Sequence, residues 1–199
     1  MPNRFFLLMS VAVVFNAIDP TTALADQQAC ETAARAAMLD VRHPVPMRQS
    51  FETITGGKSV KSSAVSTPDN RGMAMDANGA PVTLWADRKF YTSADKGKTW
   101  NLMSESTEEA AQAQMDGLRQ QAQNATNITC AFDIELDGKR VNHFKLDYTL
   151  YNIDMKMTGE YWVDAETGFP WRIKTTSPHN VIIGNNQPAD DIVVPDPEG

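Results

Sequence analysis

The stretch Met155–Ser177, MKMTGEYWVDAETGFPWRIKTTS, decides the fold because it predicts a β-hairpin with two different faces. Successive side chains of a strand point to opposite faces, so alternation separates an apolar side from a polar one. The turn is expected at 165–168, where Gly168 is free to adopt a positive φ. On the first arm the apolar side holds Met155, Met157, Tyr161 and Val163, and on the second arm it is expected to hold Phe169, Trp171 and Ile173.

Further runs of β-forming residues lie on both sides of this hairpin. Gly56-Gly57, Asn78-Gly79 and Asp137-Gly138 are turn pairs, and each separates two such runs by a short step. Neighbouring strands are therefore expected to pair antiparallel. The predicted strands are 48–55, 59–67, 71–76, 81–86, 89–93, 99–103, 128–136, 140–151, 154–164 and 169–177.

Two segments have helical periodicity. In 26–41 an apolar stripe runs from Cys30 through Ala34 to Met38, while Glu31 and Arg35 are expected to face outward. The second helix is expected to begin at Ser106, because Ser106 and Glu109 have the spacing of a capping box. Its stripe contains small residues, which suits a lid lying across a sheet: Ala111, Met115, Leu118, Ala122 and Ala125.

Residues 1–25 have the order of a secretory signal peptide, with Arg4, an apolar run and then Ala23-Leu24-Ala25. We expect cleavage after Ala25 and export to the periplasm. The remaining chain is expected to form one domain over 26–184, followed by a flexible or loosely docked tail over 185–199. Within that tail, 192–194 is apolar enough to dock.

Cys30 and Cys130 are predicted to form a disulfide, since an exported chain meets an oxidising compartment. The formal net charge is −7, and removal of 1–25 takes away Arg4 and Asp19, one charge of each sign. The basic residues are scattered rather than gathered in a run that could follow a phosphate backbone. Charge and pattern therefore argue against a nucleic-acid partner.

The residues that usually carry chemistry do not form a recognisable constellation. His43, His143 and His179 are isolated in sequence. Asp133, Glu135 and Asp137 alternate along one strand and could hold a cation, but the adjacent Lys139 and Arg140 make ion pairing the simpler interpretation. The sequence therefore predicts no catalytic residues, no metal site and no cofactor, and we expect the chain not to be an enzyme.

The segment Ser93–Trp100, SADKGKTW, matches the Asp-box pattern and resembles the hairpin turns of sialidase propellers. Asp95 is expected to accept hydrogen bonds from turn amides, Gly97 to take a positive φ, and Trp100 to pack beneath. The chain has one copy and no blade repeat, so the pattern predicts a structural turn rather than a glycosidase.

The order of helix, meander, helix and long strands, together with Tyr161–Arg172, YWVDAETGFPWR, resembles the LolA/LolB-like superfamily of periplasmic lipoprotein carriers and lipid-binding domains. The segment Lys89–Ser93 followed by Gly97–Trp100 also resembles a hairpin of that family. The resemblance implies an α+β fold, in which a curved antiparallel β-sheet forms an open half-barrel and two helices cover its concave face. It also implies an apolar ligand and no cofactor.

The ligand expected from this resemblance is a lipid or another amphiphile, bound by a periplasmic carrier or sensor. Methionine adapts to irregular apolar shapes and aromatic rings supply area, so such residues could line the site. The alternative is a packed core without a cavity, in a protein-interaction module that captures an envelope partner through an edge strand or the tail. The candidate ligand-binding residues are Met73, Met75, Trp85, Tyr91, Met115, Leu118, Met155, Met157, Tyr161 and Trp171.

Overall fold

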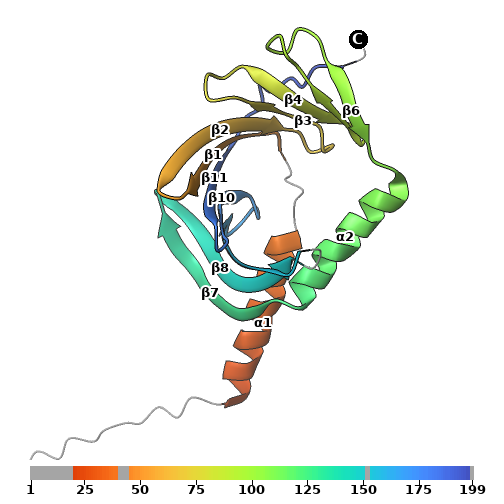
Figure 1. The fold of residues 1–199 in the computed structure, drawn as a ribbon. Coiled ribbons are helices and arrows are strands. Elements are labelled where there is room, and N and C mark those ends of the chain that lie inside the picture. The colour runs from red at the N-terminus through yellow and green to blue at the C-terminus, as the bar shows by residue number, and fades with distance from the viewer. Residues whose placement is uncertain (1–19, 40–44, 151–152, 198–199) are drawn as a thin grey trace, which may run out of the picture.

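A computed structural model describes residues 20–39, 45–150 and 153–197, with only the backbone described for 20–25. These residues form two helices and one sheet of eleven strands, which curves into a C-shaped half-barrel (Figure 1). Residues 1–19 of the predicted signal segment 1–25 lie outside the described residues, as do residues 40–44. The predicted α+β fold with an open, curved antiparallel sheet is confirmed.

The sheet is antiparallel throughout and has the order β6-β5-β4-β3-β2-β1-β11-β10-β9-β8-β7. The first six strands form a meander: β1 (Met47–Thr55), β2 (Lys58–Ser66), β3 (Gly72–Met75), β4 (Pro81–Ala86), β5 (Lys89–Thr92) and β6 (Asn101–Glu105). The other five form a second meander: β7 (Thr126–Leu136), β8 (Lys139–Leu150), β9 (Met155–Asp164), β10 (Pro170–Thr176) and β11 (Asn180–Pro188).

The two meanders join where β11 pairs with β1 in the middle of the sheet. The last predicted strand ends at residue 177, and the predicted tail begins at residue 185. Instead, β11 extends to Pro188, four residues into that segment. Its Gly184 and Asn185–Asn186 have low strand propensity, which hid the strand, but pairing on both sides imposes the extended conformation.

Helix α1 (Pro20–Leu39) lies across the concave face and contacts β7, β8 and β9 (Figure 1). Helix α2 (Glu108–Gln123) contacts α1 and β8, and it connects β6 to β7, the two edge strands of the sheet. The capping residue differs from the prediction. Thr107, rather than Ser106, accepts a hydrogen bond from the Ala110 amide at 3.2 Å, so the helix begins one residue later.

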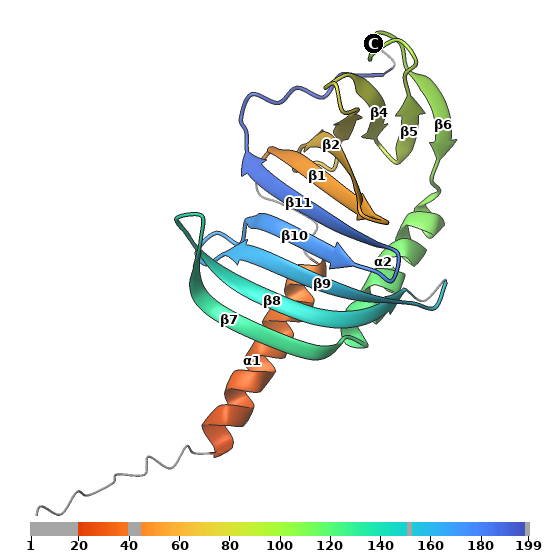
Figure 2. The same ribbon diagram turned by 60° about the vertical axis from the view of Figure 1, so that its left-hand side comes forward.

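The N-terminal half of α1 projects beyond the sheet (Figure 2), and the side chains of residues 26–29 are exposed. The helix starts at Pro20, so the cleavage that we predict after Ala25 would fall within this projecting part. Within the described residues, neither helix is long and apolar enough to cross a membrane.

The sheet buries opposite faces in its two halves. The helix-face cluster lies between the helices and the concave face of β8 and β9, and it consists of Ala34, Met38, Ala122, Ala125, Phe144, Leu146 and Tyr161. The outer-face cluster of Leu84, Ala86 and Tyr91 lies on β4 and β5, packed with Trp100 and Val194. Tracing the strand register from β8 to β4 places Leu84 and Tyr91 on the side opposite Phe144.

The segment after β11 covers the outer-face cluster. Val194 packs against that cluster, and the Arg71 guanidinium donates a hydrogen bond to the Pro195 carbonyl at 3.2 Å. Asp191 pairs with Arg48 at 2.5 Å. Part of the expected tail is therefore a packed element of the fold.

Candidate functional site

The concave face can be followed across the sheet by residues that lie opposite one another on neighbouring strands. One such row consists of Phe144, Tyr161, Ile173, Gly184, Phe51 and Ser62. Phe144 and Tyr161 are buried under the helices, whereas Phe51 and Ile173 are half-buried. The apolar lining therefore continues from the helix-covered strands to β1.

Apolar side chains are exposed on the concave face near the middle of the sheet. Ile182 on β11 lies opposite Thr53 on β1, which lies opposite Val60 on β2. Ile182 is 36% exposed and Val60 is 64% exposed. Exposed apolar side chains on a concave surface are available to an apolar ligand.

A pocket of about 500 Å³ lies between β4–β6 and the first turn of α2. Trp85 and Phe90 lie opposite each other on the concave face and line this pocket together with Thr107 and Ala110. The Trp85 ring lies over Gly72, where a Cβ atom would come within 2.1 Å of Trp85 Cζ2. Gly72 is thus required for the close approach of the indole to the sheet, and Phe90 remains 40% exposed beside it.

The sequence-predicted ligand residues do not form one lining. Trp85, Met155, Met157 and Tyr161 lie on the concave face, and Met115 and Leu118 are half-buried on α2. The other four lie on the outer face: Met73, Met75, Tyr91 and Trp171. The predicted role of all ten residues in ligand binding stays a prediction.

Trp171 lies on the outer face because β10 contains a register shift between Pro170 and Arg172. The extra residue interrupts the alternation, so the expected common face of Phe169, Trp171 and Ile173 is wrong. The Trp171 indole donates a hydrogen bond to Asp164 at 3.1 Å, and the Lys139 ammonium lies 4.5 Å from its ring centre.

Residues that the sequence analysis missed include Phe51, Val60, Phe90 and Ile182. Each belongs to a strand in which apolar and polar residues alternate only in part, as in Lys58–Ser66. The signal that could have identified them is the strand register. Once the strand pairing is known, the register places these side chains on the same face as Trp85.

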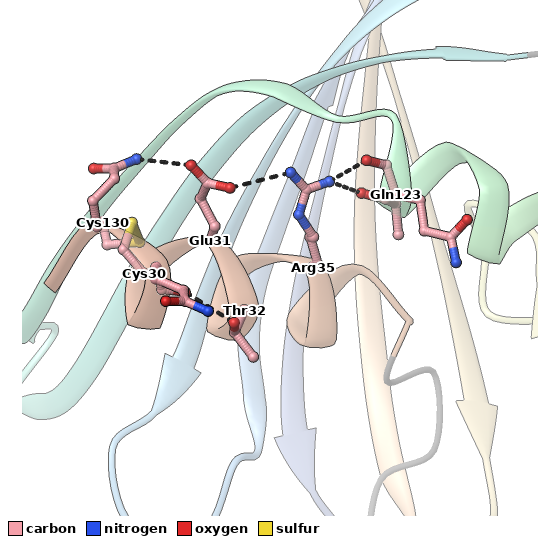
Figure 3. Close-up of polar contacts among 9 residues, drawn as sticks. Cys30, Glu31, Thr32, Arg35, Gln123 and Cys130 are labelled. Atoms are coloured by element: carbon pink, nitrogen blue, oxygen red, sulfur yellow. Dashed lines mark hydrogen bonds and ion pairs between the residues drawn. A yellow bond between two sulfur atoms is a disulfide. The ribbon is translucent and has the colours of Figure 1, made fainter. Parts of the chain in front are cut away.

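A disulfide and an arginine fix the two helices (Figure 3). The predicted Cys30–Cys130 bond is confirmed and joins α1 to the concave face of β7, with the two Cα atoms 5.7 Å apart. Arg35 was expected to face outward, but its guanidinium donates to the carbonyls of Ala122 and Gln123 at the end of α2. A cation at a helix C-terminus satisfies carbonyls that lack partners within the helix.

The Arg35 side chain is held in place by its own helix. Glu31, one turn earlier, pairs with the guanidinium at 3.4 Å and accepts a hydrogen bond from Gln27 at 3.2 Å. Cys30 and Arg35 are five residues apart, so the covalent link to β7 and the polar link to α2 lie close together on α1 (Figure 3).

Two tyrosines on the concave face remain neutral at physiological pH. Burial raises the pKa of Tyr161, and burial also raises the pKa of Tyr148 against the opposing effect of a hydrogen bond with Thr175. This part of the face thus contributes hydroxyl groups but no phenolate charge.

The Asp-box turn forms as predicted. Asp95 accepts hydrogen bonds from the amides of Thr99 and Lys98 at 2.9 and 3.1 Å, and Gly97 has φ +82°. Trp100 packs against the outer-face cluster beneath the turn. The amide of Thr99 makes the largest contribution to lowering the pKa of Asp95 to about 2.

Among the described residues, no group of three or more His, Cys, Asp or Glu side chains could hold a metal ion. His143 stacks on Trp162 with ring centres 4.4 Å apart, and its Nε2 lies 3.5 Å from Glu160. Burial lowers the pKa of His143, although Glu160 opposes this effect.

No family model matches the chain, and no curated protein matches it in sequence. Among solved structures, the lipoprotein LppX of Mycobacterium tuberculosis matches with a TM-score of 0.56 at 9% identity, over 88% of this chain and 99% of that chain. The fold is similar to that of LppX.

LprF from Mycobacterium bovis matches with a TM-score of 0.49 at 12% identity, over 87% of this chain and 97% of that chain. A LolA superfamily protein from Nitrosomonas europaea matches with a TM-score of 0.35 at 10% identity, over 79% of this chain and 91% of that chain. At these identities the likeness concerns the fold alone.

Proposed function

We propose that this chain is an exported protein that binds a lipid or another amphiphile on its concave face, as a carrier or a sensor. The observation that carries the proposal is the pocket of about 500 Å³ lined by Trp85 and Phe90, next to the start of α2. Because the outer-face cluster on these strands packs on the other side, the two concave-face aromatic rings are left available to a ligand.

The exposed Val60 and Ile182 extend this apolar surface toward the middle of the sheet. Burial of an acyl chain there would contribute about 0.8 kcal/mol per methylene before the costs of ordering. The curved sheet supports the same proposal, because the pocket lies between its concave face and the first turn of α2.

The test is native mass spectrometry, with organic extraction, of the protein isolated from its exported compartment without detergent. We expect a reproducible added mass that extracts as lipid. The purified protein should also take up a fluorescent fatty acid, and Phe90→Ser should weaken uptake by about tenfold, since an apolar aromatic contact of that size is worth about 1.5 kcal/mol or more.

Val193→Ser is the matched control, because Val193 is 81% exposed on the segment after β11 and lies outside the pocket. Its uptake should equal that of the unmodified chain. A mass without any adduct, together with no uptake of the fatty acid, would refute the proposal.

The second candidate is a protein-interaction module that adds a partner strand to β6. All five residues of this edge strand are exposed, including the apolar Leu102 and Met103. An exposed strand edge offers unpaired backbone groups to an extended peptide. Under this alternative the same mass measurement would show a bound polypeptide and no lipid.

A further inference from the structure

A groove of about 380 Å³ lies on the outer face, where the turn between β7 and β8 rises beside the ends of β10 and β11 (Figure 2). We call it the outer groove. Ser50, Asn185 and Arg172 lie opposite one another on β1, β11 and β10 and form its floor. Asp137 in the turn and Lys139 at the start of β8 form one wall, and Arg48 lines the other side.

Positive charge converges in the outer groove although the whole chain carries a formal net charge of −7. Arg48, Lys139 and Arg172 come from three strands far apart in sequence, against one lining carboxylate, Asp137. The lining is therefore cationic in an acidic protein. Such a local excess attracts an anionic group.

The cationic side chains are positioned by neighbours before any ligand arrives. Arg172 donates from Nε to Asn185 Oδ1 at 2.7 Å, and its Nη2 pairs with Asp137 at 3.0 Å. The Lys139 ammonium lies over the Trp171 ring. Side chains that are already ordered lose less conformational freedom when they bind.

The carboxylates that pair with these arginines are exposed and can be replaced. The side chain of Asp137 is 69% exposed, and that of Asp191, which pairs with Arg48, is 74% exposed. Ion pairs at such exposure contribute little, because solvent screens them. A ligand carboxylate or phosphate that meets the guanidinium with two parallel hydrogen bonds can take their place.

Apart from the apolar Leu136 and the Trp171 ring, the rest of the lining is polar and neutral. Ser50 and Ser63 contribute hydroxyl groups, and Asn185 and Gln187 contribute amides. Hydroxyl and amide groups can both donate and accept hydrogen bonds, which matches a ligand rich in hydroxyl groups.

We propose that the outer groove is a second binding site, for an anionic, hydroxyl-rich ligand with the chemistry of an acidic saccharide. The outer groove lies on the opposite face of the sheet from the proposed amphiphile site. A result that refutes one of the two sites therefore does not refute the other. Arg172 and Lys139 bind the anionic group, while the serine and amide side chains bind hydroxyl groups.

The test is a titration of the full-length, isotopically labelled protein followed by NMR at physiological ionic strength, where long-range attraction is screened. The probes are a uronic-acid oligosaccharide, a neutral glucose oligosaccharide and inorganic phosphate. We expect saturable shifts of the Asn185 and Gln187 side-chain amides and of the Trp171 indole with the uronic-acid probe, at least tenfold tighter than with the other two.

Arg172→Gln and Lys139→Gln should each weaken binding of the uronic-acid probe by about tenfold. Lys139 is the first residue of β8, beside the hairpin turn, so Lys139→Gln keeps the test valid if Arg172→Gln fails to fold. Arg119→Gln on α2 is the matched control, because Arg119 pairs only with the exposed Asp116 among the ion pairs described for it, and it lies away from the groove.

Three results would overturn the proposal. The first is no saturable shift with the uronic-acid probe. The second is equal affinity for inorganic phosphate, which would indicate an anion site without recognition of a saccharide. The third is equal weakening by Arg119→Gln, which would indicate a general effect of charge.

Discussion

The strands under the helices and the strands of the first meander bury opposite faces of the same sheet. Around β8 and β9 the buried cluster faces the helices, whereas around β4 and β5 it faces outward and is covered by the segment that follows β11. A single continuous sheet can therefore change its buried face along its width. The concave face of β4 and β5 thus keeps Trp85 and Phe90 outside the packed core.

The largest expected effect follows from removal of the disulfide that links α1 to β7 in the helix-covered half of the sheet. Replacing both Cys30 and Cys130 by Ala should lower the free energy of unfolding by about 4–5 kcal/mol, since the bond closes a loop of about 100 residues. Chemical denaturation under oxidising conditions measures this loss. Reductant should lower the stability of the unmodified protein by a similar amount and leave the double variant unchanged.

Two matched truncations compare how much each cluster contributes to stability. Leu146 and Leu84 are both 0% exposed, one in each cluster, and truncation of either to Ala should cost about 2–5 kcal/mol. We expect Leu146→Ala to cost more, because its larger cluster and the overlying helices leave less freedom to collapse around the cavity. A greater loss for Leu84→Ala in urea denaturation would contradict this ranking.

The link between the helices can be weakened without truncating a side chain of either cluster. Arg35→Ala should cost about 1–2 kcal/mol, because hydrogen bonds to a partly exposed charged group contribute in that range. Faster amide hydrogen exchange should be confined to α2. Arg119→Ala removes an exposed pair on the same helix and should change stability by less than about 0.5 kcal/mol.

Substitutions of two neighbouring valines test whether the segment after β11 stabilises the outer-face cluster. Val194 packs on the outer-face cluster, whereas Val193 is exposed. Val194→Ala should cost about 1 kcal/mol, while Val193→Ala should stay within about 0.5 kcal/mol. Equal losses in thermal denaturation would mean that the covering segment adds nothing to the outer-face cluster.

The smallest expected effect is the loss of stability at low pH from one turn in each half of the sheet. Burial tends to raise the pKa of Asp164, but hydrogen bonds from Thr167 and the Trp171 indole lower it to about 2. Asp95 has a pKa of about 2 through its turn amides. Both values lie below the ordinary 3.8, so the stability from each turn is complete above about pH 4 and is lost as the pH falls toward 2.

Carbon-detected NMR titration of the two carboxyl groups measures these pKa values directly. A value near 3.8 for either aspartate would show that the corresponding hydrogen bonds do not persist in solution.

Much of the strand order could be predicted from alternation and turn pairs, as the agreement over Pro81–Ala86 shows. Strand β11 could not, since its glycine and asparagines indicate a loop until the partners on both sides are known. Trp171 was placed on the wrong face because one extra residue reverses the alternation. The outward position of Arg35 was wrong because helical periodicity does not show that a second helix ends beside it.

Alternation also separates the two faces of a strand without showing which face is covered. For this reason Met73 and Tyr91 were grouped with Trp85, although they lie on the opposite side. The decisive information is the position of Val194, more than 90 residues later in the chain, which covers the Tyr91 side.

Helix α2 has a consequence for the width of the half-barrel. It is the only element between β6 and β7 in the chain order, and these strands are the two edges of the sheet. Its first turn is near the tip of the β4–β5 hairpin, where the Ser106 amide donates to the Arg88 carbonyl at 2.9 Å, and its last turn is held by Arg35. At 16 residues it is about 24 Å long, and one added turn would lengthen it by about 5.4 Å. The helix thus acts as a spacer whose length sets the aperture between the two edges.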